Sequence, residues 1–336
     1  MRKLLVTGGA GFIGVNFVYY WLQHHSEDRL VVLDALTYAG NRDSLEEAVH
    51  HPQFRFVHGN IRDRFLVAEL LRTEQIDTIV HFAAESHVDR SIASPGIFLE
   101  TNVLGTFDLL EVARSVWLDV ECPFREHRFH HVSTDEVYGS LAPEDLPFTE
   151  SSRYDPQSPY AASKAASDHL VRSYGNTYGL QYTISNCSNN YGPYQFPEKL
   201  LPLCILNMTQ GKPVPIFGDG RNIRDWLYVG DHCRAIDLVL QEGVPGQTYN
   251  VGGNSEYTNL DLVEMLSAIL DELSTERQHA PYRSLITFVK DRPGHDRRYA
   301  INAEKIKKKL GFQPLVVMES GLRATVRWYL ERMGHG

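Results

Sequence analysis

Two short groups in this chain of 336 residues have the types and spacing for chemistry: Thr134-Asp135-Glu136, and Tyr160 with Lys164. Residues four apart on a helix share one face, so the phenol and the ammonium are expected to lie together. We expect a buried ammonium there to lower the phenol pKa from its free value of about 10, which makes Tyr160 a usable base. The two acids add a second proton-transfer step, so the pattern indicates a dehydration as well as an alcohol oxidation.

A glycine-rich turn, Gly8-x-x-Gly11-x-x-Gly14, follows the first predicted strand and begins a helix. Glycines permit a tight turn and let a pyrophosphate approach the backbone N–H groups of the helix N-terminus. Asp34 ends the second predicted strand. A carboxylate there accepts hydrogen bonds from an adenosine ribose and repels a 2′-phosphate. The turn and the acid together predict NAD, rather than NADP, as a cofactor.

Further cofactor contacts are expected after the third and fourth strands. Asn60 and Ile61 follow the third strand, where such folds meet the adenine ring. The fourth strand runs into Phe82-Ala83-Ala84-Glu85-Ser86, whose small alanines allow a cofactor to lie close to the backbone. The alternative for both segments is an ordinary strand-to-helix turn.

The elements that must position these residues follow from the alternation of apolar runs with amphipathic segments. Such alternation is typical of right-handed βαβ units and predicts an α/β fold, a Rossmann-type doubly wound parallel sheet. Ser133 and Thr134 end the fifth strand, at the carboxyl edge where ligands bind in such folds. The predicted strands lie at residues 4–6, 30–33, 54–57, 78–82, 129–132 and 183–186.

The composition changes near Ser188, where prolines and glycines become frequent. They predict few long regular elements before Leu260. Helices are then expected at Asn259–Leu273 and Glu319–Arg332. We expect residues 1–187 to form an NAD-binding domain, rejoined by a segment at about 225–250, and residues 188–336 mainly to form a smaller α/β substrate-binding domain.

Charge and cysteine content exclude several classes of protein. A net charge of −9 argues against a general nucleic-acid or membrane surface. The four cysteines (Cys122, Cys187, Cys204 and Cys233) contain no C-x-x-C pair, so reduced thiols in a cytoplasmic protein are expected, with no metal site. No apolar stretch reaches the length of a membrane span.

Taken together, these residues resemble the extended short-chain dehydrogenase/reductase superfamily and, more narrowly, its dTDP-glucose 4,6-dehydratases. The resemblance covers nearly the whole chain. Its most specific motifs are Asp34-x-Leu-Thr-Tyr-Ala-Gly-Asn41, Ala83-Ala-Glu-Ser-His-Val-Asp-Arg-Ser91, Thr134-Asp-Glu136, Ser188-Asn-Asn-Tyr-Gly-Pro-Tyr-Gln195, Pro197-Glu-Lys-Leu200, Arg224-Asp-Trp-Leu-Tyr228, and Arg292-Pro-Gly-His-Asp296 with Arg298-Tyr299.

The resemblance implies an NAD-dependent hydro-lyase of deoxysugar (dTDP-rhamnose) biosynthesis that regenerates NAD in each turnover. Tyr160, with Lys164 and Thr134, would remove the O4 proton of dTDP-glucose while the C4 hydride passes to NAD. Glu136 would then take the C5 proton while Asp135 protonates the departing C6 hydroxyl. Return of the hydride to C6 leaves dTDP-4-keto-6-deoxy-glucose.

The resemblance also implies which residues contact the two ligands. For the cofactor it adds Phe12, Ile13, Leu36, Thr37, Ser86, Thr101 and Asn190. For the substrate it implies Ser86, Thr134, Asn189, Glu198, Lys199, Leu200, Pro215, Ile216, Phe217, Arg224, Asn259, Arg292, His295 and Tyr299. Arg224 and Arg292 suit a diphosphate, and Phe217 suits stacking on a pyrimidine. Surface charge and core packing are the alternatives.

Other readings stay open at this point. A dehydratase of UDP-glucose differs in its substrate by one methyl group, which residue types do not decide. A 4-epimerase would share Tyr160, Lys164 and NAD but has no use for Asp135-Glu136. A non-catalytic NAD sensor would be expected to lack the tyrosine or the lysine. A homodimer through helices at about 102–116 and 161–178 is expected by resemblance. Asn60 departs from the family's aspartate and removes a charge from the adenine pocket.

Overall fold

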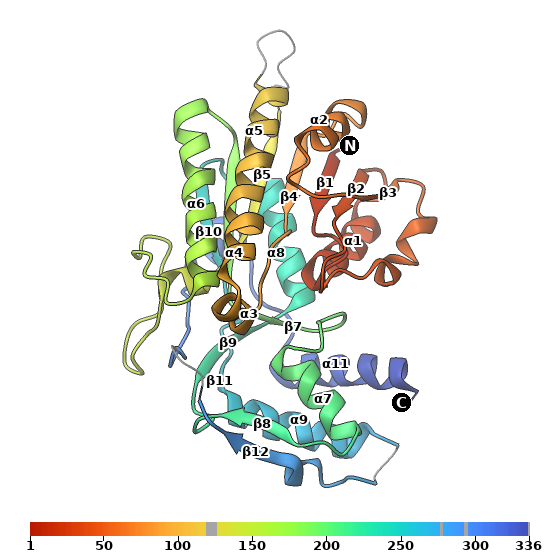
Figure 1. The fold of residues 1–336 in the computed structure, drawn as a ribbon, viewed down its shortest axis with the longest axis vertical. Coiled ribbons are helices and arrows are strands. Elements are labelled where there is room, and N and C mark those ends of the chain that lie inside the picture. The colour runs from red at the N-terminus through yellow and green to blue at the C-terminus, as the bar shows by residue number, and fades with distance from the viewer. Residues whose placement is uncertain (119–125, 276–277, 292–294, 335–336) are drawn as a thin grey trace.

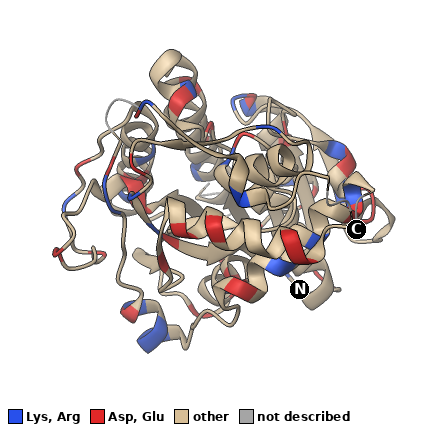
Figure 2. Ribbon diagram, turned by 90° about the horizontal axis from the view of Figure 1, so that it is seen from below, with Lys and Arg blue, Asp and Glu red and all other residues tan. Residues whose placement is uncertain are grey.

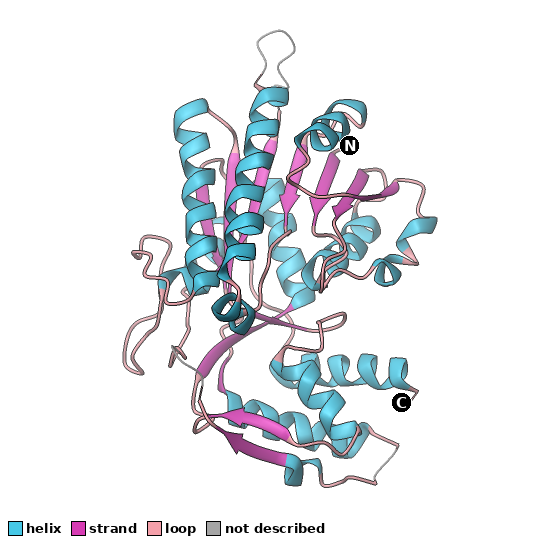
Figure 3. Ribbon diagram, viewed as in Figure 1, coloured by secondary structure: helices cyan, strands magenta, loops and turns pink. Residues whose placement is uncertain are grey.

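The computed structural model of the protein describes residues 1–118, 126–275, 278–291 and 295–334. Its larger part is a parallel seven-stranded sheet between two layers of helices, in the strand order β10-β6-β5-β4-β1-β2-β3 (Figures 1 and 3). This arrangement confirms the predicted doubly wound α/β fold. The strands are β1 (Lys3–Thr7), β2 (Arg29–Asp34), β3 (Phe54–His58), β4 (Thr78–His81), β5 (Arg128–Thr134), β6 (Tyr182–Cys187) and β10 (Gln247–Val251).

The sheet is buried on both faces because its strands are apolar on both sides. In β1, Leu5 packs against the first helix layer, whereas Leu4 and Val6 pack against the second. Trp117 and the other buried residues of the first layer come from α2 (Arg64–Thr73), α5 (Gly105–Trp117) and α6 (Pro159–Tyr178). The second layer contains α1 (Phe12–His24) and α8 (Val229–Glu242).

A smaller region lies beyond the carboxyl edge of the sheet (Figure 1). It buries its own apolar core between helices and a short parallel strand pair. The expected helices near 259–273 and 319–332 are confirmed within it. Its elements are α7 (Leu200–Thr209), α9 (Asn259–Leu273), α11 (Met318–Met333), β8 (Val214–Phe217), β12 (Ile286–Val289), and the sheet of β7 (Asn189–Tyr191), β9 (Ile223–Tyr228) and β11 (Glu256–Thr258).

The prediction of few long elements before Leu260 is wrong. Pro202 lies in the first turn of the ten-residue α7, where the missing N–H leaves no hydrogen bond unmade. Further along, the fourteen-residue α8 packs on α1, and β10 pairs with β6. The chain thus returns to the large sheet over residues 229–251.

The remaining elements are short and mostly flank the site. Acidic and basic residues are interspersed along helices and loops (Figure 2). None of the helices in the described ranges combines the length and the apolar character needed to cross a membrane. The short elements are η1 (Arg42–Leu45), η2 (Ala48–His50), α3 (Val88–Ala93), α4 (Pro95–Phe98), the π-helical η3 (Leu99–Leu104), η4 (Asp135–Tyr138), η5 (Tyr282–Leu285) and α10 (Glu304–Leu310).

Candidate active site

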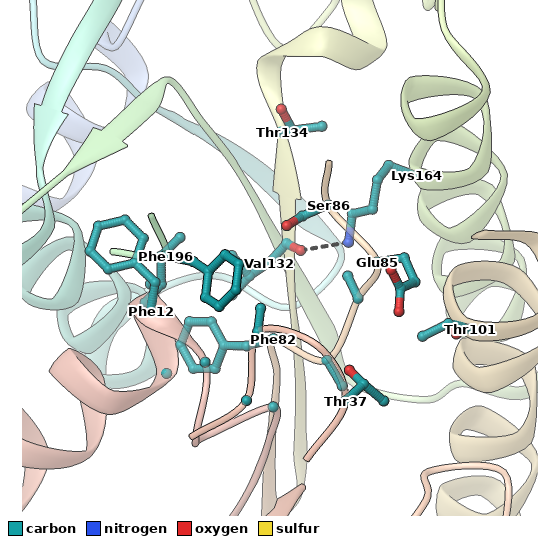
Figure 4. A pocket seen from close by; sticks show the side chains of 18 of the residues that line it. Phe12, Thr37, Phe82, Glu85, Ser86, Thr101, Val132, Thr134, Lys164 and Phe196 are labelled. Carbon is teal, nitrogen blue, oxygen red and sulfur yellow. Dashed lines mark hydrogen bonds between the residues drawn. The ribbon is translucent and has the colours of Figure 1, made fainter. Parts of the chain in front are cut away.

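A large cavity lies at the carboxyl edge of the sheet and extends to the segment 195–199 (Figure 4). It brings together every predicted cofactor residue except Leu36, whose side chain packs against the core instead. All five predicted catalytic residues also line it. The cofactor residues found there are Gly8, Gly11, Phe12, Ile13, Gly14, Asp34, Thr37, Asn60, Ile61, Phe82, Ala83, Ala84, Ser86, Thr101, Tyr160, Lys164 and Asn190.

The glycine turn has room for backbone but not for side chains. Gly8 has φ +71°, and a Cβ there would lie 2.6 Å from the amide nitrogen of Ala83. A Cβ on Gly14 would lie 2.2 Å from the carbonyl oxygen of Gly8. A Cβ on Gly11 would make one contact within 4 Å, at 3.3 Å from the carbonyl oxygen of Gly8. The turn therefore keeps the helix α1 N-terminus close to the sheet and open to the cavity, as a dinucleotide pyrophosphate requires.

Asp34 fixes the loop that follows β2. Its carboxylate accepts hydrogen bonds from the amides of Ala10 (2.9 Å) and Leu36 (2.8 Å). Burial raises the pKa of this carboxyl, and the two backbone hydrogen bonds oppose the rise. The acid thus stands at the ribose end of the glycine turn, which fits NAD.

Asn102, which no sequence pattern marks, ties the loop after β4 to α6. Its amide accepts from the backbone N–H of Glu85 (2.9 Å) and donates to the carbonyl of Glu85 (3.0 Å) and to Ser163 Oγ (2.8 Å). A single buried asparagine in an apolar helical stretch carries no local signal of this role. The contact holds two walls of the cavity in fixed positions.

Lys164 is bound to the strand that carries Thr134. Its Nζ donates to the carbonyl of Val132 at 2.9 Å (Figure 4), and burial lowers its pKa to about 8. Burial raises the pKa of Tyr160 well above its ordinary value, and the charge of Glu136 raises it further, while a hydrogen bond with Thr134 opposes both. The expected lowering of the phenol pKa by Lys164 is therefore wrong for the protein alone, because burial dominates.

The acid pair begins the short helix η4 directly after β5. Thr134 Oγ1 accepts from the amide of Glu136 (3.3 Å) and donates to the Asp135 carboxylate (3.4 Å). Burial raises the pKa of Asp135 well above its ordinary value, and the negative charges of Glu136 and Asp225 add to the rise. Burial thus favours the protonated form of Asp135. Its buried Oδ2 has no hydrogen-bond partner among the described residues.

Five of the predicted substrate residues line the same cavity: Ser86, Thr134, Asn189, Glu198 and Lys199. The Nζ of Lys199 donates to the Ser86 carbonyl at 2.9 Å and so joins the two regions of the chain. Arg292 lies outside the described residues. The others do not line this cavity: Leu200, Pro215, Ile216, Phe217, Arg224, Asn259, His295 and Tyr299.

Of these, Arg224 and Tyr299 lie beside the acid pair. The guanidinium of Arg224 lies 4.3 Å from the Tyr299 ring centroid and donates to the carbonyls of Ile223 (2.8 Å) and Asp296 (3.0 Å). The charge of Arg224 opposes the rise in the pKa of Asp135. Burial raises the pKa of Tyr299, and the charge of Glu136 adds to the rise.

The other predicted substrate residues lie deeper in the smaller region. Ile216 is buried in its core, and the partly buried Leu200 packs against that core. The Phe217 ring faces His295 edge-on at 6.4 Å. Asn259 begins α9.

Several cavity residues were not predicted. Tyr38 meets Phe196 edge to face at 5.7 Å, and the Arg90 guanidinium lies 3.6 Å from the Tyr38 ring centroid. Glu85 and Cys187 also line the cavity. Tyr38, Glu85 and Arg90 belong to motifs quoted above, which was the available signal; Phe196 and Cys187 do not.

Comparisons with known proteins agree with this geometry. The family model described as GDP-mannose 4,6 dehydratase matches residues 5–325. The dTDP-glucose 4,6-dehydratase of Neisseria meningitidis is 54% identical, with 98% of this chain and 94% of that protein covered.

Solved structures are similar over nearly the whole chain. DesIV, a dTDP-glucose 4,6-dehydratase from Streptomyces venezuelae with NAD and TYD bound, is 49% identical with a TM-score of 0.89, covering 99% of this chain and 98% of that one. A UDP-glucose 4-epimerase from Thermotoga maritima with UDP-glucose is 28% identical with a TM-score of 0.87, covering 99% of this chain and 100% of that one. Two different activities therefore share this fold.

Proposed function

The chain belongs to the GDP-mannose 4,6 dehydratase family, and we propose that it converts dTDP-glucose to dTDP-4-keto-6-deoxy-glucose and water with NAD as its cofactor. One observation carries the proposal. The acid pair Asp135-Glu136 adjoins Tyr160 at the end of β5, in the cavity that holds the glycine turn. The relatives named dTDP-glucose 4,6-dehydratase support the choice of nucleotide.

The first stage is oxidation at C4 of the sugar. Tyr160 takes the proton of the O4 hydroxyl, and Thr134, its hydrogen-bond partner, orients that oxygen. Bound NAD supplies a positively charged hydride acceptor. A nearby cation favours the phenolate, so we expect the pKa of Tyr160 to fall when the cofactor binds beside Lys164.

The second stage is elimination of water across C5 and C6. The new C4 ketone acidifies the C5 proton, which Glu136 removes. Asp135, which burial keeps protonated, gives its proton to the departing C6 hydroxyl. The hydride then returns to C6 from the cofactor, and Glu136 returns its proton to C5. The proton that Tyr160 took from O4 then passes to Asp135, directly or through solvent, which restores all three residues.

The fold alone does not exclude a 4-epimerase, because the epimerase structure matches almost as well. An epimerase needs the tyrosine and the cofactor only, whereas this cavity also holds the two adjacent acids Asp135 and Glu136. For the nucleotide, one methyl group is worth only ~1–3 kcal/mol in a hydrophobic pocket. UDP-glucose is therefore the competing substrate to test.

The decisive experiment is proton NMR of dTDP-glucose incubated with the purified protein and NAD in D2O. The proposal expects a new C6 methyl signal, deuterium at C5 and no net accumulation of NADH. A galactose-type anomeric signal without a methyl group would establish an epimerase instead. An unchanged spectrum, followed by conversion of UDP-glucose, would correct the nucleotide.

We further propose that residues 1–187 with 225–250 hold NAD, and that residues 188–336 mainly hold the nucleotide sugar. The three described cysteines are free and buried, which supports a cytoplasmic site of action. For a homodimer through the α5 and α6 side, the support is apolar exposure: Leu99 and Leu104 are 54% and 42% exposed. Leu104→Glu is expected to yield monomers in sedimentation velocity if this face is the interface.

A further inference from the structure

Asp168 is a buried carboxylate that the reaction described above does not use. It lies one turn after Lys164 on α6, and both residues are buried. Residues four apart on a helix share one face, so the carboxylate lies near the Lys164 side chain, and its charge acts on the ammonium. A charge with no exposed surface is costly unless it is paired, and this position therefore needs an explanation.

Tyr154 and His131 contact Asp168, and both favour its ionised form. Its Oδ2 accepts from the Tyr154 hydroxyl at 2.7 Å, and its Oδ1 lies 3.3 Å from His131 Nε2 on β5. Arg172 donates to the same Tyr154 oxygen at 2.7 Å. Burial raises the carboxyl pKa, but His131, Lys164 and Tyr154 outweigh it, and the net direction is downward.

The same cluster touches the strand end that carries the chemistry. Asn186 Nδ2 on β6 donates to the Tyr154 hydroxyl (3.2 Å) and to the Thr134 carbonyl (3.4 Å). Lys164 Nζ donates to the carbonyl of Val132, two residues before Thr134. Through Tyr154 and Asn186, Asp168 is therefore linked to the carbonyl of Thr134, on the strand whose Val132 carbonyl holds the ammonium.

Among the described residues whose charge acts on Lys164, Asp168 is the one carboxylate. His131 on β5 and His81 on β4 are buried, and burial lowers the pKa of each, that of His131 to about 4, so both are neutral near pH 7. Burial raises the pKa of the Cys187 thiol on β6 to about 12, so it too is neutral.

We propose that Asp168 is a positioning residue that keeps Lys164 positively charged and aimed at the end of β5 throughout the reaction. The inference rests on the proposed function, in which Lys164 must be an ammonium to favour the Tyr160 phenolate. Lys164 is charged below its pKa, which is about 8 with Asp168 present. The negative charge raises that pKa, so its removal must lower it, and activity must then be lost at lower pH.

The test is the pH dependence of kcat for methyl-product formation in Asp168→Asn and in the smaller Asp168→Ser, either of which serves if the other does not fold. A downward shift of one pH unit gives roughly a fivefold lower kcat at pH 8 and a change of only about 10% at pH 6. Asp168→Glu, which keeps the charge, is expected to restore the wild-type alkaline limb, that is, the pH range over which kcat falls at high pH.

Asp231→Asn is the matched control. Asp231 is a buried carboxylate on α8 that accepts the amides of Leu315 and Val316 at 2.9 Å each, so its loss perturbs the fold without touching the site. It should leave the alkaline limb in place. The proposal would be overturned if Asp168→Asn or Asp168→Ser folds and its kcat falls at the same alkaline pH as that of wild type. It would also be overturned if Asp168→Glu or Asp231→Asn shifts that pH by the same amount.

A readout without substrate separates this inference from the proposed function. The pKa of Lys164 is followed by NMR of 13Cε-labelled lysine, with Lys164→Arg used only for assignment. A fall of about one unit in the charge-removing variants supports the inference even if wild type fails to convert dTDP-glucose. Wild-type turnover with an unchanged Lys164 titration in those variants refutes the inference alone.

Discussion

Replacing Gly14 with alanine is expected to weaken both the fold and NAD binding, whereas the same change at Gly11 is expected to weaken NAD binding alone. The two positions differ in what a new methyl group meets. At Gly14 it would lie 2.2 Å from the Gly8 carbonyl oxygen and 2.7 Å from Gly9 Cα. At Gly11 it would meet one atom at 3.3 Å.

The clash at Gly14 is with backbone, so α1 or the turn must move by about 1 Å to reach ordinary contact. Overpacking of this kind costs ~1–3 kcal/mol of folding free energy, and we expect a fall in Tm on the order of 2–6 °C. Gly11 has φ −85° and ψ 172°, which alanine adopts freely, so its folding free energy should change by less than about 0.5 kcal/mol.

NAD affinity follows a different rule. The middle glycine of such turns lets the backbone approach the pyrophosphate, so a methyl group on Gly11 enters ligand space and should raise the Kd for NAD about tenfold or more. Gly14→Ala raises the Kd indirectly by displacing the turn.

The assay is calorimetry: thermal unfolding of protein freed of NAD, then titration with NAD. Gly96→Ala, on α4 where a Cβ would meet nothing within 4 Å, is the matched control and should match wild type in both. An equal loss of Tm in Gly11→Ala and Gly14→Ala would refute the reasoning.

Four further predictions concern the acids and the base. Tyr160→Phe should abolish absorbance at 340 nm in a single turnover and lower kcat at least ~100-fold while the Kd for NAD stays within threefold, because only the base is lost. Asp135→Asn should still show that absorbance but form the methyl product ~10²–10⁴-fold more slowly. The raised pKa of Asp135 means that the folded chain binds this proton more tightly than the unfolded chain, whose aspartates ionise near pH 3.9. The stability that this proton contributes is therefore lost as the pH rises from about 4 through the raised pKa of Asp135. Urea titrations should show that the change from pH 5 to pH 8 is less destabilising in Asp135→Asn than in wild type. Asp34→Ser should bind NAD about tenfold more weakly and discriminate less against NADP, as measured by titration with each.

The large sheet and its ligand-binding edge were predictable because each strand is a short apolar run. Such runs are typical of the buried strands of a parallel sheet. Leu4 to Val6 are buried in the sheet as expected. The glycine turn was equally predictable, because most of the atoms that exclude a side chain there come from the turn itself. A Cβ on Gly14 would meet Gly8 and Gly9, whereas a Cβ on Gly8 would meet Ala83 on the neighbouring segment.

Properties that depend on residues far apart in the sequence could not be predicted from it. The pKa of Tyr160 depends on how completely other elements cover it, and no local pattern reports that cover. Asn102 and Asp168 are single polar residues in helices whose partners lie up to 61 residues away in sequence. The helix α7 was missed because proline content was counted without regard to position, although proline in a first turn costs a helix nothing. The helix α8 contains no proline and was missed because the prediction for the proline-rich segment was extended over it.

The late return of the chain to the large sheet bears on how this protein is made. The strand β6 is complete at Cys187, yet its neighbour β10 comes only after residues 188–246, which contain α7 and α8. On the ribosome, β6 is therefore an unprotected sheet edge with every residue destined for burial until residue 251 has emerged. A stalled or truncated chain that ends before β10 should expose this edge to pairing with other chains, and such nascent chains are expected to need a chaperone.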